Sequence, residues 1–246
     1  MRRYDFSAHR LFVDSALAPG TLVPCRADQA NYLRNVLRLG LGDQILIFNG
    51  RDGEWCARIA EARKSTTTLS AETQVRPQQA TPDIDYLFAP LKRARLDYMV
   101  QKATEMGVAR LRPIFTRRTT PERINGARMR ANAIEAAEQC GILRVPDVLD
   151  AETLVAAIAH WDRRRRLIFC DEDSDEPDPL AALGALEPGP LALLIGPEGG
   201  FDDAERELLT SQAFAVRISL GPRILRADTA AVAALALVNA TLGDWR

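Results

Sequence analysis

Two apolar segments near the C-terminus, each ending in a Gly-Pro turn, constrain the fold of this chain most strongly. Residues 191–195 (LALLI) run into residues 196–200 (GPEGG), and residues 218–220 (ISL) run into residues 221–226 (GPRILR). Short uninterrupted apolar runs are typical of buried parallel strands. Turns at the carboxyl ends of such strands are where open α/β sheets bind ligands. The sequence therefore predicts one small-molecule site that uses both turns.

Around these segments, strand-like and helix-like patterns alternate, which predicts a mostly parallel, three-layer α/β domain. We expect strands over residues 84–90, 110–115, 167–170, 191–195 and 216–220, and helices over residues 94–106, 122–139, 151–161, 202–212 and 228–242. Gly107 is placed to end the first of these helices. Asp202 and Glu205 have the spacing of a capping box at the start of another.

The N-terminal part has a different pattern. Strand-like runs at residues 10–13, 42–48, 54–60 and 67–73, with a helical spacing over 28–38, predict a small β-barrel of about five strands. The polar stretch 74–83, which carries two prolines, is interpreted as a linker. The predicted domains are therefore residues 1–75 and 76–246.

Charge is distributed unevenly along the chain, although the formal net charge is only −1. Residues 92–130 contain eleven lysines and arginines against three acidic residues, and residues 171–187 contain seven acidic residues and no base. Solvated helix faces could account for a few of the basic residues. The excess favours contact between this segment and a nucleic-acid backbone.

Several other classes of protein are disfavoured. The four cysteines lie far apart without a Cys-x-x-Cys pair, and there are only two histidines, so we expect reduced thiols and no metal. The longest apolar run near the end, residues 229–238, is much shorter than the roughly 20 residues of a membrane span. The polar, charged N-terminus does not have the pattern of a signal peptide, so a cytoplasmic location is expected.

Two features leave alternatives open. The last predicted helix is rich in alanine and apolar on most faces, so it either forms a subunit interface, which we favour, or lies buried inside a monomer. Walker and Rossmann spacings are absent from the glycine-rich turn at 196–200. Its acidic residue, Glu198, favours a cationic or amine-bearing ligand over a phosphate.

Taken together, these motifs resemble the SPOUT methyltransferases, and most closely the bacterial family that methylates N3 of a uridine in 16S ribosomal RNA. The resemblance is carried by residues 193–200 (LLIGPEGG), 220–226 (LGPRILR) and 228–230 (DTA). It continues through residues 101–108, 138–139 and 144–146, and into the N-terminal part through residues 35–39 and 42–43. It therefore covers nearly the whole chain in order.

The resemblance implies a PUA-like N-terminal β-barrel, a C-terminal domain with a trefoil knot, S-adenosylmethionine as cofactor and a homodimer. The implied RNA partner is 16S ribosomal RNA, within the small ribosomal subunit. Residues 169–172 would supply a third loop to the cofactor site. The matching positions would bind the cofactor through Leu194, Ile195, Gly196, Glu198, Gly199, Ile218, Leu220, Gly221, Ile224, Leu225 and Arg226.

The predicted chemistry requires a group that accepts the uridine N3 proton, or cations that stabilise the uridinate. Candidates are Glu105 or Asp228 as base and Arg226 as stabiliser. The alternative roles are structural: Glu105 would pair with Lys102, and Asp228 would cap the last helix. Ala227-Asp228 and Ile142 depart from the family pattern. Predicted RNA contacts are Arg2, Arg3, Arg10, Arg34, Arg93, Lys102, Arg117 and Arg118. The alternatives are another RNA or base position, or an RNA-binding protein without catalysis.

Overall fold

The computed structural model describes residues 8–63, 66–119, 124–174 and 178–245. Two compact units divide the chain. Unit 1 consists of Met1–Ala80 and Ile134–Val145, and unit 2 consists of Thr81–Ala133 and Pro146–Arg246. Unit 1 therefore includes a segment, residues 134–145, that lies between the two segments of unit 2 in the chain. In the described part of the chain, no helix combines the length and apolarity needed to cross a bilayer.

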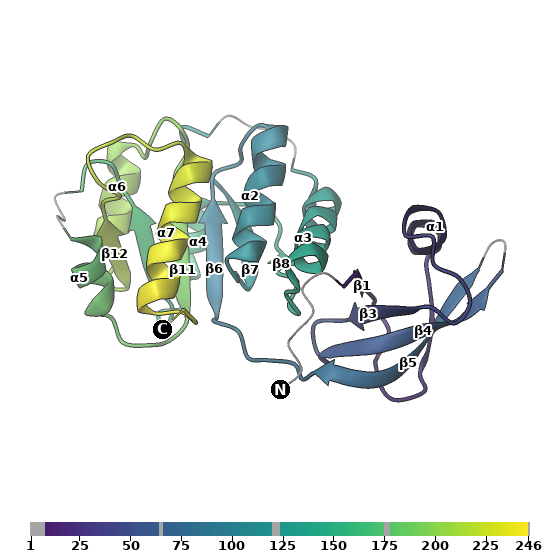
Figure 1. Ribbon diagram of the computed structural model, residues 1–246. Helices are drawn as coiled ribbons and strands as arrows, with labels where there is room; N and C mark the ends of the chain where they lie inside the picture. The colour runs from purple at the N-terminus through teal and green to yellow at the C-terminus, as the bar shows by residue number, and fades with distance from the viewer. Residues whose placement is uncertain (1–7, 64–65, 120–123, 175–177, 246) are drawn as a thin grey trace. The chain divides into compact units, whose positions relative to one another are not determined.

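Unit 1 is a five-stranded sheet with a helical segment, in agreement with the predicted β-rich module (Figure 1). The strand order is β1-β3-β4-β5-β2. Its elements are β1 (Arg10–Phe12), β2 (Leu22–Pro24), α1 (Ala27–Asn31), the π-helix η1 (Tyr32–Val36), β3 (Gln44–Phe48), β4 (Glu54–Ala62) and β5 (Thr67–Arg76). The core of the sheet includes Val23, Leu33 and Ile47, all fully buried.

Asn49 and Gly53 stabilise the turn between β3 and β4. Asn49 Oδ1 accepts hydrogen bonds from the backbone N–H groups of Arg51 and Asp52 at 3.1 and 2.9 Å. Gly53 has φ +76°, and a Cβ there would lie 2.3 Å from the carbonyl oxygen of Arg76, so only glycine fits. Three details differ from the sequence predictions. Strand β2 was not predicted, β5 extends into the expected linker as far as Arg76, and the expected helix 28–38 is α1 continued by η1.

Unit 2 is a seven-stranded sheet in which every paired strand is parallel to its neighbour. The order is β12-β10-β11-β6-β7-β8, and β9 also pairs with β7. Its strands are β6 (Ile84–Phe88), β7 (Arg110–Phe115), β8 (Asp147–Val148), β9 (Glu152–Thr153), β10 (Arg166–Cys170), β11 (Leu191–Ile195) and β12 (Ala215–Ile218). This arrangement confirms the predicted parallel α/β domain.

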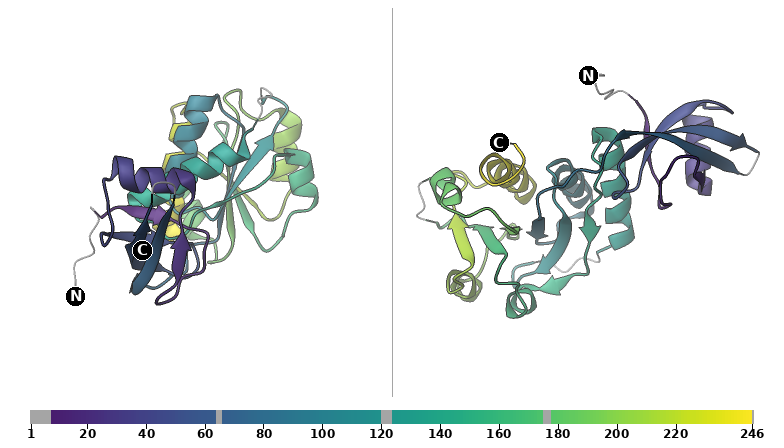
Figure 2. Two further views of the ribbon diagram at one scale, coloured as in Figure 1. Left: turned by 90° about the vertical axis from the view of Figure 1, so that its right-hand side faces the viewer. Right: turned by 90° about the horizontal axis from the view of Figure 1, so that it is seen from below.

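Helices cover both faces of this sheet (Figures 1 and 2). On one face lie α2 (Arg93–Glu105), α5 (Pro179–Gly184) and α7 (Ala227–Thr241), and on the other lie α4 (Leu154–Ala159) and α6 (Asp203–Thr210). Helix α3 (Gly126–Cys140) begins in unit 2 and ends in unit 1. Glu205 completes the predicted capping box with Asp202 at the start of α6, and Gly107 has φ +78° after α2.

The predicted strands of unit 2 begin and end within a few residues of their expected positions, but two of its helices differ from the prediction. The expected helix 151–161 begins only at Leu154, because Glu152 and Thr153 pair with β7 as β9. Helix α5 was not predicted. It forms inside the acidic segment because Asp178 caps it, accepting from Leu180 N and Ala181 N at 3.0 and 3.1 Å, and Pro179 opens its first turn.

Candidate active site

A cavity of about 320 Å³ lies at the carboxyl ends of three neighbouring strands, β12, β10 and β11. Residues 170–172 line it after β10, residues 195–201 after β11, and residues 219–221 and 223–225 after β12. Ala227 and Ala230 of α7 also line it. The two Gly-Pro turns therefore meet at one cavity, as expected for turns at one edge of a parallel sheet.

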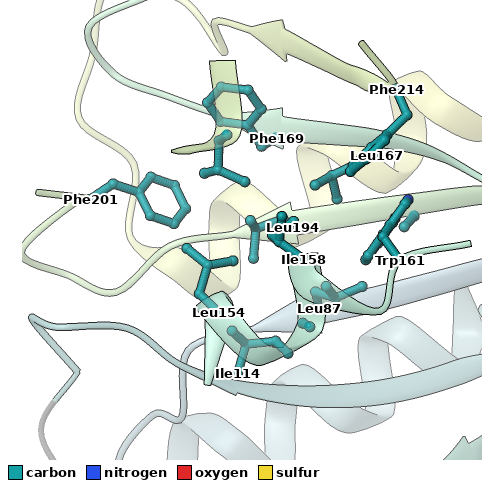
Figure 3. Close-up of a cluster of buried hydrophobic side chains, with 13 residues drawn as sticks. Leu87, Ile114, Leu154, Ile158, Trp161, Leu167, Phe169, Leu194, Phe201 and Phe214 are labelled. Carbon is teal, nitrogen blue, oxygen red and sulfur yellow. The ribbon is translucent and has the colours of Figure 1, made fainter. Parts of the chain in front are cut away.

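Glycines allow the β11 loop to approach its neighbours closely. A Cβ on Gly196 would lie 2.9 Å from the ring of Phe201, and a Cβ on Gly200, where φ is +68°, would lie 2.2 Å from Glu172 Oε1. Phe201 anchors the end of this loop, because its ring packs edge-on against that of Phe169 in the buried cluster of Figure 3. The two ring centroids lie 6.3 Å apart. The loop is thus held close enough for its backbone groups to line the cavity.

The acidic side chains around the cavity already have basic partners. Asp171, buried at the end of β10, accepts from Arg206 Nε at 3.1 Å and Arg217 Nε at 2.8 Å. Arg206 also binds Glu172 at 2.8 Å, and Glu198 forms an ion pair with Arg95 of α2. These carboxylates therefore fix the shape of the three loops, and a bound ligand would meet the backbone and the apolar lining.

Comparison with known proteins identifies the family to which the chain belongs. An RNA methyltransferase domain model matches residues 78–239, and an RNA methyltransferase PUA domain model matches residues 26–70. A relative from Synechocystis, named ribosomal RNA small subunit methyltransferase E, is 30% identical, with 96% of this chain and 78% of the relative covered. The chain belongs to this family of RNA methyltransferases. A Rickettsia conorii protein of the same name is 29% identical over 94% of this chain and 95% of its own length.

Two solved structures are similar to this chain over nearly all of its length. A Legionella pneumophila protein solved in complex with the bound cofactor S-adenosylmethionine has a TM-score of 0.84 at 29% identity, with 96% of this chain and 99% of that chain covered. The ribosomal RNA small subunit methyltransferase E of Neisseria gonorrhoeae, bound to S-adenosylmethionine, has a TM-score of 0.82 at 25% identity, with 97% and 100% covered. These likenesses support the predicted PUA-like and SPOUT-type architecture.

Most of the predicted cofactor residues come together at the cavity. Its lining includes Ile195, Gly196, Glu198, Gly199, Leu220, Gly221, Ile224 and Leu225. Leu194 and Ile218 lie inside their strands, fully buried, and Arg226 is the exposed residue before α7. Residues 170–172, from the segment expected to supply a third loop, also line the cavity. Sequence reasoning missed Phe201 and Ala230, although Phe201 directly follows the glycine pair and could have been included.

The three predicted catalytic residues do not lie together. Arg226 and Asp228 flank the start of α7 beside the cavity-lining Ala227. Asp228 is the second residue of α7 and not its N-cap, which is Arg226. Glu105 lies at the other end of the helix pair, because Asn239 Nδ2 of α7 donates to Met106 O beside it at 2.8 Å. Twelve residues of helix separate Ala227 from Asn239, about 18 Å. Glu105 instead binds Lys102 at 2.7 Å.

The predicted RNA-contacting residues fall into three groups. Arg2 and Arg3 lie outside the described residues. The prediction that Arg10 contacts RNA is wrong. Its side chain is buried in unit 1 and paired with Glu54 at 2.9 Å, so it cannot reach an RNA backbone. Arg93, Arg117 and Arg118 are exposed, whereas Arg34 and Lys102 are half-buried, Lys102 beside Glu105.

Several arginines of the basic segment 92–130 form ion pairs and hydrogen bonds within the protein. Arg110 and Arg112 form ion pairs with Asp85, which is buried in β6. Arg118 Nη1 donates to Gly199 O at 2.8 Å, and Arg117 Nη1 binds Asp202 at 3.2 Å. Arg117 and Arg118 therefore contact the β11 loop and its following turn, although both remain exposed. No local pattern predicts these contacts, because the loop and the two arginines lie some 80 residues apart in the chain.

Proposed function

We propose that this protein transfers a methyl group from S-adenosylmethionine to N3 of a uridine in 16S ribosomal RNA of the small ribosomal subunit. The observation that carries the proposal is the cavity at the ends of β10, β11 and β12, built from the Gly-Pro turns in a chain of the ribosomal RNA small subunit methyltransferase E family. The PUA-like unit and the exposed cations near the cavity support an RNA substrate.

The residues around the cavity fit S-adenosylmethionine. Its volume lies within the range of small-molecule sites. Apolar side chains such as Leu220 and Leu225 suit an adenine ring, and the close glycine loops offer backbone donors and acceptors to ribose and amino-acid groups. When bound there, the cofactor supplies an electrophilic methyl group carried on a sulfonium.

The chain's own residues must prepare the nucleotide. A neutral uridine N3 carries a proton, which Asp228 could accept from its position at the start of α7. Arg226, exposed one residue before the helix, would stabilise the negative charge that develops on the base. We do not assign Glu105 to this task within one subunit, because it lies at the far end of α2.

Two further features of the family belong to the proposal. Helix α7 buries one face, including Ala231, Ala234 and Leu235, but leaves Val232 and Leu237 of its other apolar face partly exposed. A second subunit covering that face would form a homodimer. A trefoil knot would be consistent with the path from edge strand β12 to α7, which packs on β11 and α2. An experimental crystal structure would test both.

The test is methyl transfer to 16S RNA and to small subunits isolated from a deletion strain, followed by mass mapping of the methylated nucleoside. We expect 3-methyluridine at one position. Methylation of another base or RNA would replace the uridine-N3 assignment, and RNA binding without transfer would indicate a non-catalytic protein. Failure to bind S-adenosylmethionine in calorimetry would refute the proposal.

Arg226→Ala should lower turnover at least about tenfold, which corresponds to about 1.4 kcal/mol of transition-state stabilisation. The reason is that an arginine beside the uridine stabilises the negative charge that develops on it in the transition state and is absent from the ground state. Arg163→Ala is the matched control, because Arg163 is an exposed arginine of the same unit before β10, away from the cavity edge. Equal turnover in both variants would remove Arg226 from the mechanism.

A further inference from the structure

A second cavity, of about 650 Å³, lies in unit 2 outside the site described above. It is bounded by the end of β6 and the first turns of α2 and α3, elements that lie side by side in Figures 1 and 2. None of its lining residues lines the first cavity. It is therefore a separate candidate binding site.

The walls combine apolar side chains with two arginines and with Asp97, whose carboxylate is bound by one of them. Leu91 and Met129 are buried to 6% and 1% exposure, and Leu96 is half-buried, so together they present an apolar surface. Arg93 is exposed and interacts electrostatically with Asp97. A ligand with a flat apolar part and a negative charge would suit both kinds of wall.

The second arginine of the cavity is held in a fixed orientation. Arg128 Nε donates to Asp97 Oδ1 at 2.9 Å, and Nη2 donates to Oδ2 at 2.5 Å. Asn132 Nδ2 holds the same carboxylate at 2.7 Å. A fork pair of this kind fixes the guanidinium plane and leaves its other edge for a second partner. Arg93 and Arg128 can thus approach one anionic group from two helices.

The two cavities open at the same edge of the sheet. Strands β6 and β11 are paired in parallel, and Ala89 N donates to Ile195 O at 3.2 Å where both strands end. Paired strands lie about 4.8 Å apart. The Arg95–Glu198 ion pair also joins the first turn of α2 to the loop that lines the first cavity. One extended ligand could therefore reach both.

We propose that the second cavity binds one nucleotide of single-stranded RNA, next to the nucleotide that is methylated. Its base would lie against Leu91, Leu96 and Met129, and its phosphate would bind Arg93 and Arg128. Bases in an RNA duplex are stacked and paired, so only an unpaired nucleotide can enter such a cavity. This inference rests on the proposed RNA methyltransferase function and adds a substrate contact to it.

Binding of the full-length protein to a fluorescent single-stranded RNA spanning the methylated uridine tests the proposal, with salt varied and no cofactor added. Arg93→Ala should weaken binding about tenfold and lower the slope of log Kd against log salt by about 0.7, the contribution of one single-strand phosphate contact. Leu96→Trp should fill the cavity and weaken binding by a similar factor without changing the slope. Arg163→Ala should match the wild type in both measurements.

Further readouts separate the explanations. Binding of S-adenosylmethionine should be unchanged in Arg93→Ala and Leu96→Trp, which also checks that both variants fold. Wild-type RNA affinity and salt slope in both variants, in a protein that methylates RNA, would overturn the inference and leave the proposed function intact. A change in sedimentation with RNA affinity unchanged would also overturn it, since a second protein chain would then occupy the cavity. A wild-type protein without methyl transfer would instead refute the proposed function.

Discussion

At the scale of single residues, Glu54 is a fully buried carboxylate whose charge is balanced by two arginines. Arg10 Nε lies 2.9 Å from its Oε1, and Arg76 Nε lies 2.8 Å from its Oε2. Burying charges costs free energy, which such a set recovers only when its members are paired in good geometry. The triad therefore fixes the start of β1 against β4 and the end of β5.

Arg10→Ala should destabilise the protein by about 3–5 kcal/mol, because it leaves buried Glu54 with one partner fewer. Urea unfolding followed by circular dichroism measures this change. Arg58→Ala serves as the control, since it breaks the exposed Arg58–Glu72 pair and should leave the unfolding midpoint nearly unchanged. Equal midpoints for the two variants would contradict a structural role for Arg10.

Asp97 links stability to pH in a defined direction. Its hydrogen bonds from Arg128, together with that from Asn132, hold the pKa of the carboxyl below its ordinary value of 3.8. The stabilisation is therefore complete above pH 3.8 and is lost as pH falls through the lowered pKa. In urea unfolding, Asp97→Asn should be less stable than wild type at pH 6, with the difference shrinking at pH 3. A constant difference would exclude this linkage.

At the scale of elements, α7 has two apolar faces and only one of them is buried. Val232→Glu places a charge on the partly exposed face and should convert the proposed dimer to a monomer in analytical ultracentrifugation. Val155→Glu is the matched control on α4, where the side chain is 62% exposed on the opposite face of the sheet. A monomeric wild type, or a dimeric Val232→Glu variant, would contradict the α7 interface.

Elements were predictable where local pattern and tertiary environment agree. The apolar run at 191–195 forms a strand because both sides of a parallel sheet are buried, and the pattern shows this directly. The two-residue strands β8 and β9 depend on pairing with β7 and leave no periodic signal. Helix α5 has a cap signal, but its acidic surroundings concealed it.

The candidate site was predictable only in part for the same reason. Both Gly-Pro turns carry their own signal, and the sheet brings them together. The pairing of Arg95 with Glu198, and of Arg118 with Gly199, depends on contacts between residues about 100 and 80 positions apart. Charge counts likewise cannot distinguish buried Arg10 from exposed Arg93.

At the scale of the whole molecule, the first segment of unit 1 depends on residues that follow it by more than fifty positions. Phe12 N donates to Glu138 Oε1 at 2.8 Å, and Arg76 Nη2 donates to Gly141 O at 2.8 Å. Ala137 and Leu143 pack against Phe12 and Phe48. The segment 134–145 thus supplies both hydrogen bonds and apolar contacts to the β-sheet unit.

A fragment of residues 1–80 should therefore not fold stably on its own, because Phe12 and Phe48 would lose their apolar cover. Amide proton NMR should show poor dispersion for this fragment. Joining residues 134–145 to it through a flexible Gly/Ser linker should restore dispersed signals. A well-dispersed spectrum from residues 1–80 alone would show that the returning segment is dispensable.

The returning segment also sets an order of events during synthesis. The last strand of unit 1 ends at Arg76, yet Val145 must leave the ribosome before the unit is complete. At about 5–20 residues per second, the 65 residues between Ala80 and Val145 take about 3–13 s to translate. For that interval residues 1–80 lack the segment that covers Phe12 and Phe48, so we expect them to remain incompletely folded. Chaperones that bind nascent chains would meet this protein at that stage.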